Sequence, residues 1–363
     1  MTSTQLWPAL VVPVLNGMAF LLALGFRRNR AVMLLAILTI ASLALASHEQ
    51  TLLAIRGEEA IRMFAPWLLL AAAAVPERRL LARGNLALLA MLAMAIWLTL
   101  AAPVHIWPLL RDVLPLGWLD LKAGLVGAGL VFAAAILCWA RWLASRVPME
   151  SALGFVLILV AIALLPTMRA GAILDLLAIA GALAIAAILF TSYRMAFVDG
   201  LAGLPNRRAL DEALARLSGD FMLAMVDVDH FKAFNDRHGH AAGDRVLQAV
   251  ANQLKATRGA NAYRYGGEEF CLVFTGAGMR QAEESCEELR ERVESMRVKV
   301  RSTPARKRST SKPTRDSSAV SVTISIGLAA RSPRGRDSTE VLKAADKALY
   351  AAKAKGRNRV VAP

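Results

Sequence analysis

The chain has 363 residues, of which 56% are hydrophobic, and it carries a formal net charge of +15. Its mean hydropathy of +0.45 is too high for an ordinary soluble protein, and the apolar excess lies before residue 193. In a membrane protein a basic balance reflects cytoplasmic loops and lipid-facing surfaces, so we expect no nucleic-acid partner. The three cysteines, Cys138, Cys271 and Cys286, are widely spaced, which argues against a disulfide framework or a cysteine metal site.

Apolar segments predict a multi-pass α-helical membrane domain over residues 1–193, which we interpret as a sensor. A spanning helix needs roughly 20 residues. Seven candidates follow one another, at residues 7–26, 31–47, 61–75, 86–103, 123–142, 151–167 and 172–193. The third is short and carries Arg62, so it is either a span or an interfacial helix. No basic region precedes the first segment, so we expect no cleavable signal peptide.

The basic residues between these segments predict the orientation in the membrane. They alternate with loops of mixed charge, which is the positive-inside pattern, and place the amino terminus outside and residues 194–363 in the cytoplasm. The basic residues in question are Arg27, Arg28, Arg30, Arg78, Arg79, Arg83, Arg141, Arg146 and Arg194. Asn16 and Asp175 are the polar residues expected within spans; Asp175 lies near a helix end, where reaching the interface is as good an interpretation as function.

Two motifs in the second half of the chain place carboxylates close together. The sequence YGGEEF at residues 265–270 joins two strand-like segments, and its glycine pair is typical of a tight hairpin. The apolar strand 221–228 runs into DVDHFK at residues 227–232. Acids at a strand end and at a neighbouring hairpin can meet on one edge of a sheet. Such oxygen ligands, together with a phosphate-bearing substrate, are what a hard cation such as Mg²⁺ requires.

These motifs, with Asn235, His240 and Asp244 at fixed offsets, resemble the diguanylate cyclase (GGDEF) domain, here with a GGEEF signature. The resemblance covers roughly residues 199–361. DGLAGLPNRR at residues 199–208 resembles the family's entry motif, with Ala202 where threonine is usual, and ADKALYAAKAKGRN at residues 345–358 resembles its closing motif. The resemblance implies that residues 194–363 form a palm-like α/β (α+β) domain with a central, mostly antiparallel sheet. It also implies a bacterial inner membrane protein with its catalytic domain in the cytoplasm.

Periodicity predicts the elements of this domain in chain order. Strands are expected at residues 221–228, 262–265, 268–275, 320–330 and 359–361, and helices at 243–257, 279–296 and 339–355, after a helix capped by Asn206. Residues 298–316 hold seven basic side chains and one acid, and are expected to form a mobile loop. Two interpretations stay open for it: a solvated loop, or contact with anionic lipid.

The predicted substrate is GTP, and the resemblance implies condensation of two GTP into cyclic di-GMP with release of two pyrophosphates. Asp227 and Glu268 are the expected ligands of Mg²⁺, with Mn²⁺ as an alternative. The resemblance adds the backbone carbonyl of Val228 and places Glu269 next to the same ions. Glu268 is also the residue that such families assign as proton acceptor.

The remaining site residues are expected to bind the nucleotide. Lys232 is placed for a phosphate contact that stabilises developing charge. An amide and a carboxylate, from Asn235 and Asp244, can pair with the edges of guanine. The resemblance adds His240 as a substrate contact. Lys353 and Arg357 are four residues apart on a predicted helix, so they would share a face and bind the terminal phosphates.

The family's inhibitory product site, an Arg-x-x-Asp sequence, is missing at its usual spacing, where Thr257 and Ala260 stand instead. Arg258 and Asn261 are a poor substitute, so we expect weak or no feedback inhibition through that site. The product joins two GMP halves symmetrically, which requires two domains facing each other, so a homodimer is predicted. Two alternatives remain: a catalytically inactive GGDEF receptor that binds GTP or cyclic di-GMP, and a transporter or scaffold with a regulatory domain.

Overall fold

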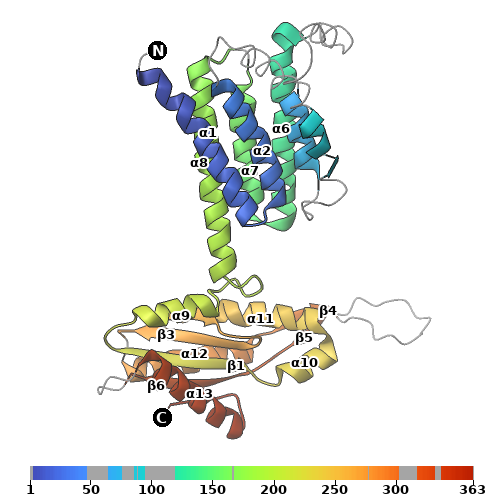
Figure 1. Ribbon diagram of the computed structural model, residues 1–363. Helices are drawn as coiled ribbons and strands as arrows, with labels where there is room; N and C mark the ends of the chain where they lie inside the picture. Colours follow the sequence, from blue (N-terminus) through green and yellow to red (C-terminus); the bar gives the residue numbers. More distant parts are fainter. Residues whose placement is uncertain are drawn as a thin grey trace, which may run out of the picture. The chain divides into compact units, whose positions relative to one another are not determined.

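The computed structural model describes residues 3–46, 64–75, 86–87, 89–94, 119–165, 167–276, 278–301, 317–331 and 337–362. Several predicted features lie outside the described residues. They are the mixed-charge loop at residues 48–60 that follows the second apolar segment, the end of the fourth apolar segment, most of the basic loop, and the side chains of Arg62, Arg78, Arg79 and Arg83. The chain divides into two compact units, Met1–Ser192 and Tyr193–Pro363 (Figure 1).

The first unit is helical. Its labelled helices are α1 (Ser3–Gly25), α2 (Asn29–Ala46), α6 (Leu119–Ser145), α7 (Pro148–Ala163) and α8 (Ala170–Phe197), and residues 64–74 are also helical. Short turns join α1 to α2 and α6 to α7, and each pair packs side by side (Figure 1). Apolar side chains nevertheless remain on the surface of the unit, including Leu21, Phe155 and Ile179, each more than half exposed. Such a surface indicates contact with lipid or another apolar partner.

Two stretches of this unit are long and apolar enough to cross a membrane, Leu125–Ser145 and Gly171–Phe197. The other apolar helices within the described residues are shorter by the same measure. The predicted span at residues 151–167 is too long at its carboxyl end, because α7 stops at Ala163. The sequence places Pro166 shortly after, and proline cannot continue a helix.

Arg30, predicted to lie in a basic loop, is instead buried inside the helical unit. Its guanidinium forms an ion pair with Glu150 at the start of α7 and donates to the carbonyl of Val75 (Nε–O 3.1 Å). Arg141 donates to the carbonyl of Ala74 (Nη2–O 2.7 Å). Two guanidinium groups therefore occupy the last carbonyls of the helix at residues 64–74, which satisfies its carboxyl end.

Of the two polar residues expected within spans, Asn16 is fully buried and Asp175 is exposed. The Asn16 amide donates to the carbonyl of Val12 (3.1 Å). A Cβ placed on Gly181 would lie 2.9 Å from the Asn16 Oδ1 atom, so this glycine permits close approach of α8 to α1. Asn16 therefore belongs to a tight helix–helix crossing of the kind that small residues allow.

The second unit is built on a sheet with the strand order β2-β3-β1-β6-β7. The strands are β1 (Phe221–Val228), β2 (Ala260–Arg264), β3 (Glu269–Thr275), β6 (Ile324–Ala330) and β7 (Val360–Val361). All neighbours pair antiparallel except β6 and β7, which are parallel. The predicted α/β domain with a central, mostly antiparallel sheet is confirmed.

Helices cover both faces of this sheet (Figure 1). The helices α11 (His240–Lys255) and α12 (Met279–Ser295) pack on one face, and α9 (Arg207–Arg216) and α13 (Ser338–Ala354) on the other. The central strand β1 divides its side chains between them, since Met222, Ala224 and Val226 face α11 and α12, whereas Leu223 and Met225 face α9 and α13. Because side chains alternate along a strand, Asp227 lies on the α13 face.

The structure of this unit departs from the predicted elements at several places. A short helix, α10 (Phe231–His238), follows β1 and was not predicted. The strand expected at residues 320–330 is broken at residues 321–323, because β5 (Ser317–Val320) pairs with β4 (Val298–Arg301) whereas β6 pairs with β1. The strand β4 also occupies the start of the segment predicted as a mobile loop.

Candidate active site

The YGGEEF motif forms a tight turn beside the end of β1. Register pairs Asp227 with Glu269. The N–H groups of Tyr265 and Gly266 both donate to the carbonyl of Glu269 (2.9 and 3.1 Å), and the N–H of Val228 donates to the carbonyl of Glu268 (3.4 Å). The two predicted acids are therefore brought together by backbone pairing.

Asp227 and Glu268 form an acidic pair with limited compensation. Asp227 is 4% exposed, and its Oδ2 atom lies 2.8 Å from the Nζ atom of Lys353. Burial raises the pKa of Asp227, although the Lys353 ammonium opposes that rise. Burial and the charge of Asp227 raise the pKa of Glu268. Both acids would therefore be stabilised in their ionised form by additional positive charge.

The donor set fits a hard cation only in part. In the portion of the chain that the structure describes, no group of three or more His, Cys, Asp or Glu side chains is arranged to hold a metal ion. Asp227 and Glu268 offer two neighbouring carboxylates, and Val228, the residue after Asp227, offers a backbone carbonyl. The Glu269 carboxylate lies against Gly266, with its Oε2 atom 3.0 Å from the position of a Cβ there. Two carboxylates are enough for Mg²⁺, which keeps several waters and takes further ligands from substrate phosphates.

Asp229, which was not among the predicted site residues, holds neighbouring segments of the site together. Its carboxylate accepts hydrogen bonds from Thr323 Oγ1 (2.7 Å), Ser325 Oγ (2.6 Å) and the backbone N–H of Asn358 (3.1 Å). These donors come from the start of β6 and from the segment after α13. Asp229 therefore fixes both segments to the end of β1. The only sequence signal was its alternation with Asp227.

Asn235 and Asp244, the predicted guanine contacts, come from adjacent helices in tight contact. A Cβ on Gly243 would lie 1.9 Å from the Asn235 Oδ1 atom, so the helices α10 and α11 meet at this pair. That Oδ1 atom is buried and has no hydrogen-bond partner among the described residues. A buried acceptor without a donor is costly, and the N–H edge of a purine such as guanine would satisfy it.

Lys232 and His240 lie at the starts of these two helices. Lys232 is in the first turn of α10, and His240 is the first residue of α11; both side chains are exposed. Neither forms a hydrogen bond or ion pair with another described residue, so both are available to a ligand. The helix α11 begins at His240, three residues earlier than predicted. Gly239 directly before it has a φ of 83°, a conformation that glycine adopts freely.

Lys353 and Arg357 do not share a helix face, because α13 ends at Ala354. Arg357 lies in the turn beyond it, at a φ of 65°, and its N–H donates to the carbonyl of Ala352 (3.0 Å). The prediction that these residues act from one helix was therefore wrong. Both cations nevertheless act on the same acid, since the charge of each opposes the burial that raises the pKa of Asp227.

The positions of the missing inhibitory site carry no charge. Thr257 is buried, and its hydroxyl donates to the carbonyl of Gln253 (3.3 Å) while it accepts from Arg292 (3.4 Å). Ala260 begins β2, and Arg258 is exposed between them. These two positions therefore present no Arg–Asp pair to an anionic ligand.

A second feature that the sequence did not reveal is a clamp on the hairpin, formed by Arg264 and Asp199. Arg264 donates to the carbonyls of Gly266 (3.2 Å) and Gly267 (2.6 Å), and its Nη1 atom lies 2.6 Å from Asp199 Oδ1. Asp199 also accepts from the N–H of Ala202 (2.7 Å). Burial alone would raise the pKa of Asp199, but the hydrogen bonds from Ala202 and Arg264 outweigh it and hold that pKa below its usual range.

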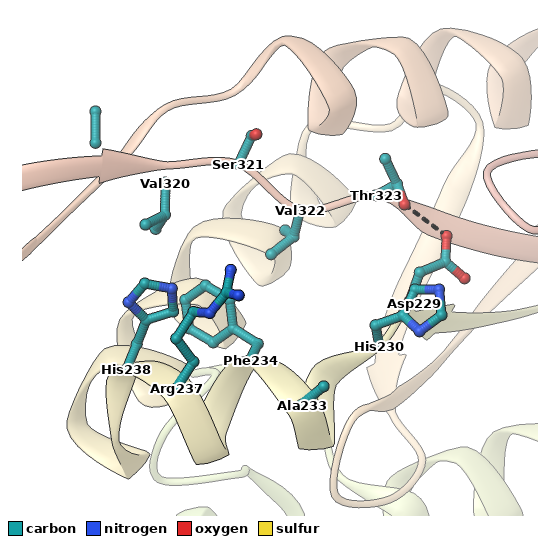
Figure 2. Close-up of a pocket in the computed structure, with 11 residues that line it drawn as sticks. Asp229, His230, Ala233, Phe234, Arg237, His238, Val320, Ser321, Val322 and Thr323 are labelled. Atoms are coloured by element: carbon teal, nitrogen blue, oxygen red, sulfur yellow. Dashed lines mark hydrogen bonds between the residues drawn. The ribbon is translucent and has the colours of Figure 1, made fainter.

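A cavity of about 640 Å³ lies next to this site but holds none of its predicted residues. It is bounded by α10 and by the extended segment before β6. Figure 2 shows Phe234, Arg237 and His238 on the helix opposite Val320 and Val322. Asp229 and His230 close one end. Asn235 is not among its lining residues, so the cavity is separate from the pair that contacts α11.

Comparisons with known proteins concern this second unit. Residues 196–359 match the family model described as the diguanylate cyclase GGDEF domain. Diguanylate cyclase VdcA of Vibrio cholerae is 37% identical over 172 residues, which cover 46% of this chain and 47% of that protein. Diguanylate cyclase DgcP of Pseudomonas aeruginosa is 37% identical over 175 residues, covering 46% and 24%. The chain thus spans less than half the length of these curated relatives.

A solved structure matches about half of the chain. The crystal structure of the coiled coil and GGDEF domain of DgcB from Caulobacter crescentus in complex with c-di-GMP is 37% identical in sequence. The match covers 49% of this chain and 92% of that one, with a TM-score of 0.42.

Proposed function

We propose that this protein is a diguanylate cyclase, which condenses two GTP into cyclic di-GMP and releases two pyrophosphates. The observation that carries the proposal is the meeting of Asp227, Glu268 and Lys353 at the end of β1, beside the GGEEF hairpin. Each 3′-hydroxyl attacks the α-phosphate of the other nucleotide, loses its proton and displaces pyrophosphate. The match of residues 196–359 to the cyclase domain supports this reaction.

Asp227, Glu268 and the carbonyl of Val228 are proposed to hold Mg²⁺, with Glu269 beside it and Mn²⁺ as an alternative ion. When bound, the metal neutralises the triphosphate and favours ionisation of the attacking hydroxyl. Glu268 is also the candidate proton acceptor. Lys232, in the first turn of α10, is proposed to stabilise the charge that develops on the phosphates.

The nucleotide is proposed to lie between α10, α11 and the turn after α13. The unpaired Asn235 Oδ1 atom accepts from the guanine N–H edge, and Asp244 accepts at the same edge. His240 contacts the substrate at the start of α11. Lys353 and Arg357 bind the terminal phosphates. Lys353 would then exchange its ion pair with Asp227 for a contact with a phosphate.

The symmetry of the product requires a homodimer. One domain carries one acidic pair and one guanine-binding site, so it binds one GTP. The 3′-hydroxyl of that GTP then has no second α-phosphate to attack. Two domains that face each other supply both. An obligate monomer with full activity would refute this part of the proposal.

We further propose that residues 1–193 form a multi-pass sensor in a bacterial inner membrane and that residues 194–363 lie in the cytoplasm. Exposed apolar side chains and the spans Leu125–Ser145 and Gly171–Phe197 support membrane insertion. The proposed orientation follows from the alternation of basic loops with loops of mixed charge in the sequence. Regulation would act by setting the distance or angle between two cytoplasmic domains.

The enzyme assignment is tested with the full-length protein in detergent, supplied with GTP and Mg²⁺. We expect cyclic di-GMP to form in the wild type and not in Glu268→Gln, whereas Glu212→Gln, a change on the exposed face of α9, keeps full turnover. Binding of GTP without turnover in the wild type would instead favour the receptor alternative. Extraction of membranes with alkaline carbonate tests the membrane assignment, which fails if the protein is released.

A further inference from the structure

The turn that carries Arg357 has an unusual backbone. Gly356, Arg357 and Asn358 follow one another with φ values of 107°, 65° and 45°. Glycine adopts positive φ freely and asparagine tolerates it, but an arginine there is strained. Strained residues persist only where the surrounding contacts hold them, and they cluster at functional sites. The contacts that hold this turn therefore bear on the site.

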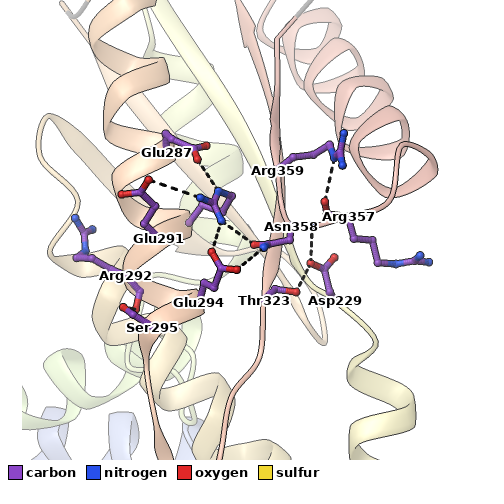
Figure 3. A network of polar contacts seen from close by, with 11 residues as sticks. Asp229, Glu287, Glu291, Arg292, Glu294, Ser295, Thr323, Arg357, Asn358 and Arg359 are labelled. Carbon is purple, nitrogen blue, oxygen red and sulfur yellow. Dashed lines mark hydrogen bonds and ion pairs between the residues drawn. The ribbon is translucent and has the colours of Figure 1, made fainter.

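Asn358 is held from two sides. Its backbone N–H donates to Asp229 Oδ2 (3.1 Å) at the end of β1. Its side chain accepts from Arg290 Nη1 (3.0 Å) and donates to Glu294 Oε1 (2.9 Å), both on α12. Figure 3 shows Asn358 between Glu294 and Asp229, with Arg357 directed away from α12. The turn is thus fixed between the end of β1 and α12.

Arg290 is itself held in place before it reaches Asn358. Its side chain is 12% exposed, its Nε atom lies 2.7 Å from Glu287 Oε1, and its Nη1 atom lies 2.6 Å from Glu294 Oε2. These acids lie one turn before and one turn after it on α12, so the guanidinium is oriented by its own helix. A planar guanidinium fixed in this way loses little freedom when it donates to a further acceptor.

We propose that Arg290 is a positioning residue for the triphosphate site: it fixes Asn358, and thereby the strained backbone of Arg357, so that the Arg357 guanidinium faces the end of β1. The inference depends on the proposed function, in which Arg357 binds terminal phosphates. Arg290 itself lies on the far side of Asn358 and does not touch the nucleotide. Without it, the turn relaxes and Arg357 samples other directions.

The test is calorimetric titration of the full-length protein in detergent with two probes. One is the α,β-methylene analogue of GTP, which carries the terminal phosphates but cannot be turned over; the other is GMP, which lacks them. Arg290→Ala is expected to weaken the analogue about ten-fold, about 1.4 kcal/mol, and to leave GMP within about two-fold. Arg280→Ala is the matched control, because its side chain is 92% exposed and pairs with Glu284 on the same helix, and it should change neither affinity.

A cycle with Arg357→Ala isolates the mechanism. That variant should also lose about ten-fold for the analogue, and the double variant should lose no more, because Arg290 then has nothing to position. Arg290→Lys keeps the positive charge but not the planar guanidinium, so its affinity for the analogue should lie between those of the wild type and Arg290→Ala. If Arg290→Ala fails to fold, Arg290→Lys replaces it in the cycle.

Three results would overturn the inference: equal loss for GMP and the analogue, losses that multiply in the double variant, or unchanged affinity in Arg357→Ala. The binding cycle does not depend on turnover. A wild type that binds the analogue but forms no cyclic di-GMP would therefore reject the cyclase proposal while the cycle still decides the role of Arg290.

Discussion

Replacing Arg264 by alanine should disable the site without touching any proposed ligand. The Arg264 side chain is 13% exposed and makes three charged contacts, two to the carbonyls of Gly266 and Gly267 and one to Asp199, which is 26% exposed. Charge-assisted hydrogen bonds contribute about 1.5 kcal/mol each at the lower end, and a partly exposed ion pair at most about 1 kcal/mol. Loss of all three should therefore cost about 3 to 4 kcal/mol in the stability of the second unit.

Turnover should fall further than stability alone explains. Glu268 follows directly after the two clamped carbonyls, so an unclamped turn moves its carboxylate relative to Asp227. A misplacement of about 1 Å in a catalytic group can cost on the order of 100-fold in rate. We expect a loss of that order in kcat for Arg264→Ala, with a thermal midpoint lower by roughly 10 °C.

The assay is cyclic di-GMP formation by the full-length protein, with thermal unfolding measured on the same preparation. Arg264→Lys keeps the charge but cannot reach three acceptors at once, so it should give intermediate values. Arg216→Ala removes an exposed pair with Glu212 and should change neither quantity appreciably. If Arg264→Ala retains turnover within three-fold and its midpoint within 2 °C, the clamp does not position the hairpin.

Three further outcomes follow from the site. In metal-free protein at neutral pH, Glu268→Gln should raise the thermal midpoint, because the raised pKa of Glu268 means that its ionised form destabilises the fold. The difference between variant and wild type should vanish in acid, where the carboxyl is protonated. Equal midpoints at neutral pH would contradict this. Gly243→Ala should weaken GTP binding roughly ten-fold, since its Cβ would displace Asn235, whereas Gly171→Ala, in open space, should leave binding unchanged. Titration with cyclic di-GMP should inhibit weakly or not at all, and inhibition that Arg258→Ala removes would show that this degenerate site still works.

The acidic edge of the site could be predicted because its parts are local. The strand that ends at Asp227 and the glycine turn before Glu268 each have a short-range pattern, and adjacent antiparallel strands then pair them. The elements that form the core are local in the same sense, since β1 begins with a continuous run of apolar residues and apolar residues recur at a spacing of three or four in α11. The meeting of Asp227 and Glu268 at one edge of the sheet could therefore be predicted without knowledge of distant side-chain contacts.

The polar contacts that fix the site could not be predicted in this way. Arg264 and Asp199 are 65 residues apart, and Arg290 and Asn358 are 68 apart. A charged residue on a helix or strand has the same local pattern whether it faces solvent or a distant partner, so periodicity does not distinguish the two. The helix α10 was missed for a related reason, because eight residues are too few for a clear amphipathic repeat.

Two acids at the end of β1 illustrate how hydrogen-bond partners determine the role of a buried carboxylate. Asp227 and Asp229 are both nearly buried, and Asp227 lies in β1 whereas Asp229 lies just beyond its last residue. Asp229 accepts three hydrogen bonds from within the domain, so its charge is already stabilised and a ligand would have to displace those donors. Among the residues that the structure describes, the Asp227 carboxylate pairs with Lys353, and its pKa stays raised by burial. An acid left short of donors at a site edge gains most from an incoming cation, and on that ground we propose Asp227 as the ligand and Asp229 as the anchor that holds it in place.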